Sequence, residues 1–147
     1  MEAQQLVAKL WSAIEAQQFD RALDYLACDF QFSGPVPATL NSLQWIRMHR
    51  AFAAAMPDIA INYIPHGDSY GMVHGSVQLS GTHTTKLDLR LPGVPAVFAT
   101  GKRITLPREK VDVAVEQGKV VVLNVERLPD GGLMGILTQM GVALPRT

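Results

Sequence analysis

The sequence lacks several features that would place it in a class at once. Cys28 is the single cysteine among 147 residues, so neither an internal disulfide nor a multi-thiolate metal site can form. No apolar run approaches the roughly 20 residues that a membrane span needs. The first residues, Met-Glu-Ala-Gln-Gln, do not have the basic-then-apolar order of a secretory signal. We therefore expect a soluble, cytoplasmic protein with no membrane partner.

Charge of one sign is also missing. Lys+Arg and Asp+Glu both number 13, which gives a formal net charge of zero, and aromatic residues make up only 7% of the chain. No basic stripe is interleaved with aromatic residues, so we expect no nucleic-acid partner. The histidines do not have metal-ligand spacing on any one predicted element, so we expect no metal site; they are His49, His66, His74 and His83.

What is present is an ordinary globular composition, with 48% hydrophobic and 18% charged residues. The length fits one domain over residues 1–147. Apolar residues at a spacing of 3.6 predict helices over residues 2–18, 19–26 and 41–55, with Asn41 as the cap of the third. The apolar residues that follow Pro129-Asp130-Gly131-Gly132 predict a short C-terminal helix around residues 133–140.

The stretch from Ile104 to Leu128 organises the rest of the chain. Val111, Val113 and Val115 alternate with polar or small residues, which is the period of a strand. A turn at 116–119 supplies a glycine, and residues 120–125 are almost all β-branched, so we predict a hairpin. The second arm is apolar on both faces, and we expect a second copy of the chain to cover the outer one, giving a homodimer through the sheet.

Helices that precede a run of strands predict an α+β fold and not a parallel βαβ sheet. Shorter strands are predicted at residues 59–63 and 72–84, with a turn at Gly67-Asp68-Ser69 between them. A mostly antiparallel sheet with few helices to cover it is expected to curl around them. Such a cone leaves an apolar pocket between helices and sheet, where small molecules usually bind.

An ordered set of short motifs resembles the SnoaL-like polyketide cyclases of the NTF2-like superfamily. The motifs are Met56-Pro57-Asp58-Ile59, Gly81-Thr82-His83-Thr84, Thr100-Gly101-Lys102, Gly118-Lys119 and Gly135-x-Leu137-x-Gln139-x-Gly141-Val142. The resemblance covers roughly residues 5–145. It implies a cone-shaped α+β barrel with a curved, mixed sheet around three N-terminal helices, a hydrophobic cavity, and ring closure by aldol chemistry without metal or organic cofactor.

The chain departs from this family at the catalytic carboxylate. The resemblance implies an aspartate seven residues before Gln139, and that position is Gly132. Asp130 lies two residues earlier and is a candidate for the same role, because Gly131 and Gly132 leave the backbone free to place it. A turn carboxylate on the surface is the alternative interpretation of Asp130.

Strand parity predicts which side chains face the cavity. Tyr63 follows Ile59 and Ile61 inward, and His83 follows Val77 and Leu79. The other residues that we expect to line the cavity or its rim are Glu109, Asn124, Glu126, and, from the helix over residues 41–55, Trp45, His49 and Phe52.

These residues define two hypotheses. In the first, Glu126 or Glu109 is a base with a pKa raised by apolar surroundings, and His83 or Tyr63 stabilises the oxyanion of an enolised carbonyl substrate. The protein is then a cofactor-free cyclase, isomerase or hydrolase acting on a hydrophobic compound. In the second, both glutamates are solvated surface groups and the chain is a non-catalytic ligand-binding or dimerising protein.

Overall fold

A computed structural model describes residues 2–36, 38–90 and 94–142. Within these ranges the chain forms four helices and eight strands. In chain order they are α1 (Ala3–Glu15), α2 (Phe19–Asp24), β1 (Leu26–Ser33), α3 (Ser42–Ala55), β2 (Ala60–Ile61), β3 (Ile64–Ser69), β4 (Met72–Val77), β5 (Leu79–Thr82), β6 (Arg103–Thr105), β7 (Glu109–Glu116), β8 (Lys119–Val125) and α4 (Gly132–Gln139). Among the described residues, none of the helices is both long and apolar enough to cross a bilayer.

The long N-terminal helices form where the apolar spacing predicts them. In α1 the buried residues are Leu6, Val7, Leu10, Trp11, Ala13 and Ile14, which make one stripe along the helix. Helix α3 begins with a capping box, in which the Asn41 side chain accepts from the Gln44 N–H and the Gln44 side chain accepts from the Asn41 N–H. The predicted helix over residues 41–55 and its cap are therefore confirmed.

The strands form two sheets that meet end to end. The larger has the order β1-β8-β7-β4-β3, with β1 parallel to β8 and all other neighbours antiparallel. The smaller has the order β2-β5-β6. Asn62 and Gln78 exchange two backbone hydrogen bonds of 3.1 and 3.2 Å at the junction, so the pairing of β3 with β4 continues into the pairing of β2 with β5. The predicted strand over residues 72–84 is thus divided at Gln78.

The hairpin between β3 and β4 turns later than the sequence predicts. Gly67, Asp68 and Ser69 are expected to form the turn, but they belong to β3. The turn is Tyr70–Gly71, with φ values of 51° and 79°. Positive φ at both central residues matches the right-handed twist of the flanking strands. A positive φ is uncommon for a residue other than glycine, so the sequence has no signal for a turn at Tyr70. The turn between β7 and β8, Gln117–Gly118, has the same form and lies where it is predicted.

A bulge divides β8 into two registers. Val120 pairs with Val115, whereas Val122 pairs with Ala114, so Val121 is an extra residue on β8. One extra residue exchanges the inner and outer faces of the strand beyond it. Val120 is buried before the bulge, and Leu123 and Val125 are buried after it. This exchange decides which polar residues of β8 can reach the interior.

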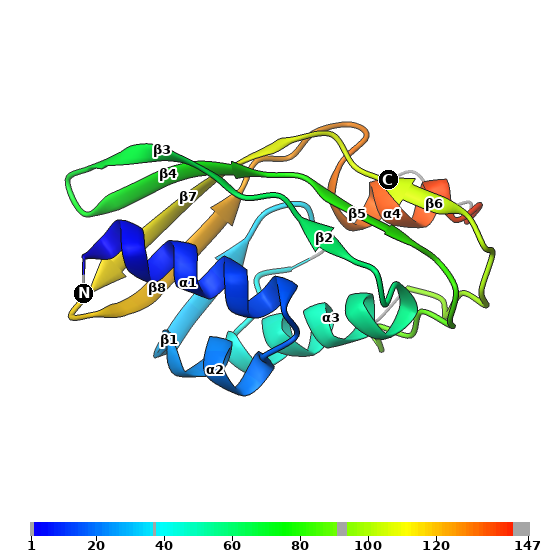
Figure 1. Ribbon diagram of the computed structural model, residues 1–147, viewed down its shortest axis with the longest axis horizontal. Helices are drawn as coiled ribbons and strands as arrows, with labels where there is room; N and C mark the ends of the chain where they lie inside the picture. Colours follow the sequence, from blue (N-terminus) through cyan, green and yellow to red (C-terminus); the bar gives the residue numbers. More distant parts are fainter. Residues whose placement is uncertain (1, 37, 91–93, 143–147) are drawn as a thin grey trace.

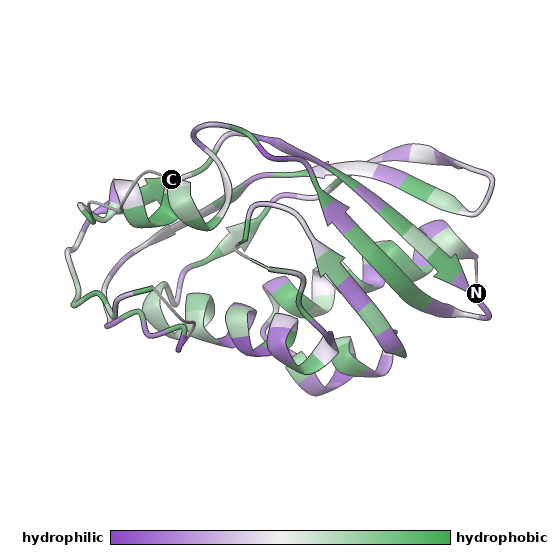
Figure 2. Cartoon of the chain, turned by 180° about the vertical axis from the view of Figure 1, so that it is seen from behind, coloured by the Kyte–Doolittle hydropathy of each residue, from purple (hydrophilic) through white to green (hydrophobic). Residues whose placement is uncertain are grey.

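Helices α1, α2 and α3 lie together on one side of the sheet, and α4 lies at the end of the molecule away from the N terminus (Figure 1). The strands of the larger sheet alternate between hydrophobic and hydrophilic residues along their length, as expected of a sheet with one buried face (Figure 2). The expected α+β cone, with a curved mixed sheet around the N-terminal helices and a short C-terminal helix, is confirmed.

The capping box of α3 gives a stability prediction. Replacing Asn41 by Ala leaves the first N–H groups of the helix without their side-chain partner, and we expect a loss of about 1 kcal/mol in the free energy of unfolding. Asn41→Asp is the matched control, because aspartate caps equally well. Urea unfolding measures both variants, and equal losses in the two would contradict the assigned role of the cap.

Candidate functional site

An apolar cavity lies between helices α1 and α3 and the inner face of the sheet, and α4 closes one end. The cavity has a volume of about 70 Å³. Seventeen residues line it: Trp11, Phe32, Pro35, Val36, Trp45, Met48, His49, Phe52, Ile61, Val77, Leu79, Leu106, Glu109, Val125, Gly132, Leu133 and Ile136. All but Gly132 and two polar side chains, Glu109 and His49, are apolar or aromatic.

Glu109 is the carboxylate that the fold buries in this cavity. It is the first residue of β7, pairs with Val77 across the sheet, and is only 4% exposed. Its Oε2 atom is buried without a hydrogen-bond partner among the described residues. Its inward position agrees with the strand parity that it shares with Val111 and Val113.

The surroundings of Glu109 make it a group that can hold or release a proton near neutral pH. Burial raises the pKa of its carboxyl group from 4.5 to about 7, a backbone hydrogen bond from Gly132 acts in the opposite direction, and the nearby charge of Glu126 raises the pKa further. Desolvation penalises the charged form because the apolar lining cannot replace water around a carboxylate.

Gly131, the residue before α4, makes room for this carboxyl group. A Cβ atom at Gly131 would lie 2.8 Å from Glu109 Oε2, closer than packed atoms normally approach. Gly132 has a φ of 63°, and a Cβ there would lie 2.1 Å from Pro35 Cβ, so a side chain has no space. Glu109 therefore places its carboxyl group beside Gly131 and Gly132, the segment in which the resemblance to the cyclases implies an aspartate.

Three nitrogen atoms of the cavity wall have no partner among the described residues. They are His49 Nδ1, Trp45 Nε1 and Trp11 Nε1. The ring of His49 lies 4.6 Å from that of Trp45 between centroids and 5.7 Å from that of Phe52. Burial lowers the pKa of His49 to about 3, so the imidazole is neutral at physiological pH. The indoles are donors only, and a neutral imidazole has one donor and one acceptor nitrogen.

The predicted inward positions on β8 are wrong for Asn124 and only partly met for Glu126. Asn124 is exposed, and its Oδ1 accepts from Ser33 Oγ at 2.9 Å on the outer face. Glu126 is half-buried outside the lining, where its Oε1 accepts from the Lys110 N–H at 3.0 Å. Both shifts follow from the bulge at Val121, which reverses the parity on which the prediction rests.

The other candidates also lie outside the cavity lining. Asp130 is exposed. His83 is fully buried beside β6, where its Nδ1 lies 2.9 Å from Thr100 Oγ1 and accepts from the Thr100 N–H at 3.3 Å. Tyr63 is half-buried and lines an adjacent cleft together with Trp11. The structure therefore brings together Glu109, Trp45, His49 and Phe52 from the predicted set.

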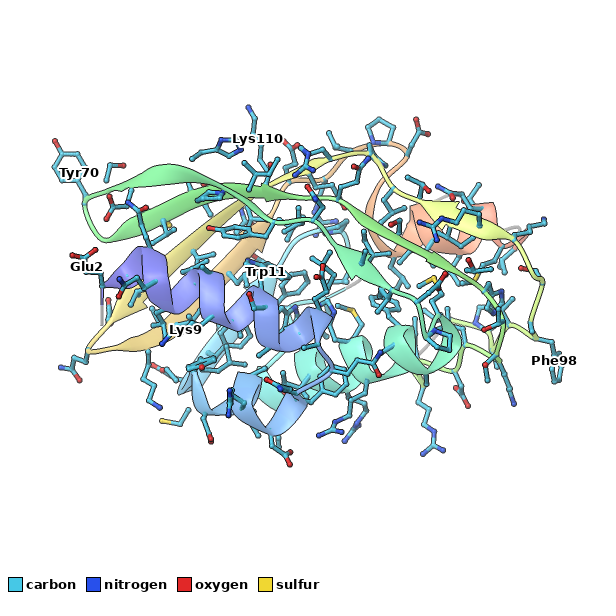
Figure 3. All side chains as sticks on the ribbon, viewed as in Figure 1. Glu2, Lys9, Trp11, Tyr70, Phe98 and Lys110 are labelled. Carbon is cyan, nitrogen blue, oxygen red and sulfur yellow. The ribbon has the colours of Figure 1, made fainter. Side chains whose placement is uncertain are left out.

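Trp11 is a cavity residue that the sequence analysis did not select. Trp11 lies on α1, near the centre of the molecule, whereas Tyr70 and Phe98 project from the two ends of the molecule (Figure 3). Its ring contacts that of Trp45 edge to face, with centroids 5.8 Å apart. The signal was available, because Trp11 is four residues after Val7 and belongs to the same buried stripe.

A separate polar cluster lies on the outer face of the larger sheet. His74 bridges Asp112 and Ser69, with Nδ1 2.7 Å from Asp112 Oδ1 and Nε2 3.0 Å from Ser69 Oγ. His74 pairs with Asp112 across β4 and β7, so the cluster ties the tip of the β3–β4 hairpin to the next strand. Within the described ranges, no group of three or more His, Cys, Asp or Glu residues could hold a metal ion.

Comparison with known proteins places the chain by its fold. Neither a protein-family model nor a curated protein matches the sequence. Solved structures do match over nearly the whole chain. A proposed polyketide cyclase from Xanthomonas campestris pv. campestris shares 16% identity and a TM-score of 0.72, covering 94% of this chain and 96% of its own.

Two further structures have similar scores. A proposed SnoaL-like polyketide cyclase from Jannaschia sp. CCS1 has 13% identity and a TM-score of 0.70, covering 95% of this chain and 91% of its own. AclR, a proposed hydroxylase from Streptomyces galilaeus, has 15% identity and a TM-score of 0.69, covering 94% of each chain. Another matching structure is named NTF2-like. At these identities the likeness is one of fold: the chain has the NTF2-like cone that SnoaL-like polyketide cyclases share.

The buried carboxyl group of Glu109 predicts a pH-dependent stability. Its pKa is higher in the folded state than in the unfolded chain, so the folded state binds more protons and stability falls as pH rises from about 4.5 to about 7. Glu109→Gln removes this penalty. We expect the variant to be more stable than the wild type by roughly 3 kcal/mol at pH 8, and the difference to shrink toward pH 4.5.

Denaturant unfolding at several pH values tests this expectation. Glu116→Gln is the control, because Glu116 is the exposed last residue of the same strand. A Glu109→Gln variant whose stability relative to wild type does not change with pH would show that the carboxyl group is solvated.

Proposed function

We propose that this protein binds a small hydrophobic carbonyl compound in the cavity and moves a proton to and from the carbon beside that carbonyl, with Glu109 as the acid/base. The reaction class is that of a cofactor-free cyclase or isomerase. The observation that carries the proposal is the carboxyl group of Glu109, which is buried in an apolar cavity with its Oε2 atom unpaired among the described residues and its pKa raised to about 7.

The proposed chemistry needs a base and a donor. The Glu109 carboxylate removes a proton from the α-carbon, and the electron pair of the broken C–H bond forms the enolate. The oxyanion accepts hydrogen bonds from the wall, for which His49 Nδ1 and Trp45 Nε1, unpaired among the described residues, are the available groups. The enolate carbon then attacks a second carbonyl of the substrate or is reprotonated at another position, and Glu109 returns the proton.

The electrostatics of the site suit this role. A base works best when its pKa lies near the working pH, because it is then both ionised and basic enough to accept a proton. An ordinary surface glutamate would be ionised at pH 7 but a weak base. Apolar surroundings also strengthen hydrogen bonds to a developing oxyanion, since water is excluded.

The names of the structural neighbours support the cyclase class without deciding it. Proteins with this fold are named as polyketide cyclases and, in one case, as a hydroxylase, so the fold serves more than one reaction. The assignment to proton transfer therefore rests on Glu109 itself. The second candidate is a non-catalytic binding protein, and the observation that favours it is Gly132, where the resemblance to the cyclases implies an aspartate.

Hydrogen–deuterium exchange of an enolisable ketone tests the proposal. Acetophenone in D₂O should lose its methyl protons faster in the presence of the protein, as followed by proton NMR. Glu109→Gln should abolish the acceleration. The rate should rise with pH around a midpoint near 7, because the base must be ionised. In Glu126→Gln the midpoint should move to lower pH, since the neighbouring charge that raises the pKa of Glu109 is removed.

The two candidate functions give different outcomes. Binding of acetophenone without any acceleration, in wild type and Glu109→Gln alike, would favour the non-catalytic protein. An acceleration that survives in Glu109→Gln but is lost in Glu126→Gln would transfer the base to Glu126. Either result would overturn the role proposed for Glu109.

We also propose that a second copy of the chain covers the outer face of the larger sheet. Val122, Ala114 and Met72 lie opposite one another across β8, β7 and β4 and form a partly exposed apolar row, in which Val122 is 39% exposed. A row of this kind on one face of a sheet suits an interface between identical chains.

Val122→Glu should therefore shift the protein from dimer to monomer in sedimentation velocity, because it places a charge in the apolar row. Leu43→Glu is the matched control: Leu43 is 61% exposed on α3, away from the sheet. A wild-type protein that sediments as a monomer would contradict this proposal.

A further inference from the structure

A second, more polar cleft adjoins the apolar cavity. The cleft has a volume of about 380 Å³. It lies between α1 and the segment that joins β2 to β3. Eight residues line it: Ala8, Trp11, Ser12, Glu15, Ile61, Asn62, Tyr63 and Pro65. Half of this lining is polar or charged, in contrast to the cavity beside it.

Trp11 and Ile61 belong to both linings, so they form the wall between the two spaces. On the cavity side the Trp11 ring meets Trp45 edge to face, and on the cleft side it stacks on Tyr63 at 6.2 Å between centroids and an interplanar angle of 25°. The ring of Tyr63 packs into the space that Gly75 leaves open, where a Cβ atom would lie 2.6 Å from Tyr63 Cε1. A molecule that fills both spaces must pass this pair of rings.

Two buried polar groups at this boundary have no partner among the described residues. They are the Tyr63 hydroxyl and Trp11 Nε1. The indole N–H can only donate, and burial raises the pKa of Tyr63, so its hydroxyl keeps its proton. Leaving such donors unpaired costs free energy, which a ligand with an acceptor atom would recover. The boundary is therefore suited to a hydrogen-bond acceptor.

The negative charge of Glu15 in the cleft favours a neutral acceptor group on the ligand over an anionic one. Among the eight lining residues Glu15 is the one charged side chain, and its Oε2 accepts from the Ile61 N–H at 2.6 Å. A carboxylate or phosphate on the ligand would approach the charge of Glu15 without a lining cation to balance it. A neutral oxygen acceptor, such as a ketone, quinone or ester carbonyl, meets no such repulsion.

We propose that the ligand of this protein is neutral and two-part, with an apolar ring in the cavity and an uncharged oxygen acceptor that bonds to Tyr63 and Trp11 at the boundary with the cleft. This inference rests on the proposed function, because it takes the apolar cavity as the place of the reacting compound. It adds a specificity site that Glu109 does not provide.

A comparison of two nearly isosteric probes tests the acceptor site. Acetophenone carries the carbonyl oxygen, and ethylbenzene has the same ring and chain length without it. We expect Tyr63→Phe to weaken acetophenone binding by roughly threefold to tenfold, the loss of one hydrogen bond, and to leave ethylbenzene binding unchanged. Dissociation constants come from NMR titration of the protein. Equal changes for both probes would overturn the proposal, since the effect would then come from packing.

Benzoate tests the charge selection. It presents acceptor oxygens on the same ring but is ionised at pH 7, and we expect it to bind the wild type at least tenfold more weakly than acetophenone. Glu15→Gln removes the charge and can keep the hydrogen bond to Ile61 through its amide oxygen. Benzoate affinity should rise in this variant while acetophenone affinity stays the same. Benzoate that binds the wild type as well as acetophenone does would contradict the inference.

The experiments distinguish failure of the acceptor site from failure of the acid/base role proposed for Glu109. If the acceptor site fails and the proposed function holds, Tyr63→Phe has no selective effect while Glu109→Gln still abolishes proton exchange. If the proposed function fails and the acceptor site holds, the probe selectivity remains and no variant alters exchange. Failure of both leaves ketone and hydrocarbon bound equally and exchange at the rate of buffer.

Discussion

The desolvation of one carboxyl group is the constraint around which this interior is arranged. Glu109 is enclosed by apolar side chains that cannot solvate its charge, and no residue in the described part of the chain bonds to its Oε2 atom. The arrangement survives because Gly131 has no side chain that would collide with the carboxyl group and because the group can remain protonated at neutral pH. A structure that tolerates this cost at one position is typical of functional sites, where stability is commonly lost in exchange for reactivity.

The carboxyl group of Glu109 lies beside the position at which the resemblance to the cyclases implies an aspartate, although it comes from another segment of the chain. The resemblance to the cyclases implies an aspartate at position 132, and the chain has a glycine there. A side chain at the adjacent Gly131 would collide with Glu109 Oε2, so the glycine there leaves room for the carboxyl group that Glu109 brings from β7. Counting back from Gln139 shows that the aspartate is absent at position 132. The folded structure is needed to show that Glu109 of β7 lies beside this position.

The features that follow from the periodicity of one helix or strand could be predicted from the sequence, whereas the features that depend on the register between strands could not. The helix over residues 41–55, the hairpin with its turn at Gln117–Gly118 and the inward position of Glu109 all follow from patterns within one element. Asn124 and Glu126 were misplaced because the extra residue at Val121 lies inside a uniform valine run, which has no signal for a bulge. The cleft beside Trp11 could not be predicted either, because its two sides come from segments about 50 residues apart.

The bulge in β8 has a consequence for how this protein can diverge. If Val121 is deleted, Val120 stays opposite Val115 and Val122 stays opposite Ala114, so the loss of that one codon would leave a regular ladder in which every later residue keeps its face. Leu123 and Val125 would still face the interior and Asn124 the solvent, and only the local bend and twist of the bulge would disappear. A lineage could thus change the curvature of this sheet wall, and with it the shape of the cavity, by one deletion that exchanges no side chain between the two faces.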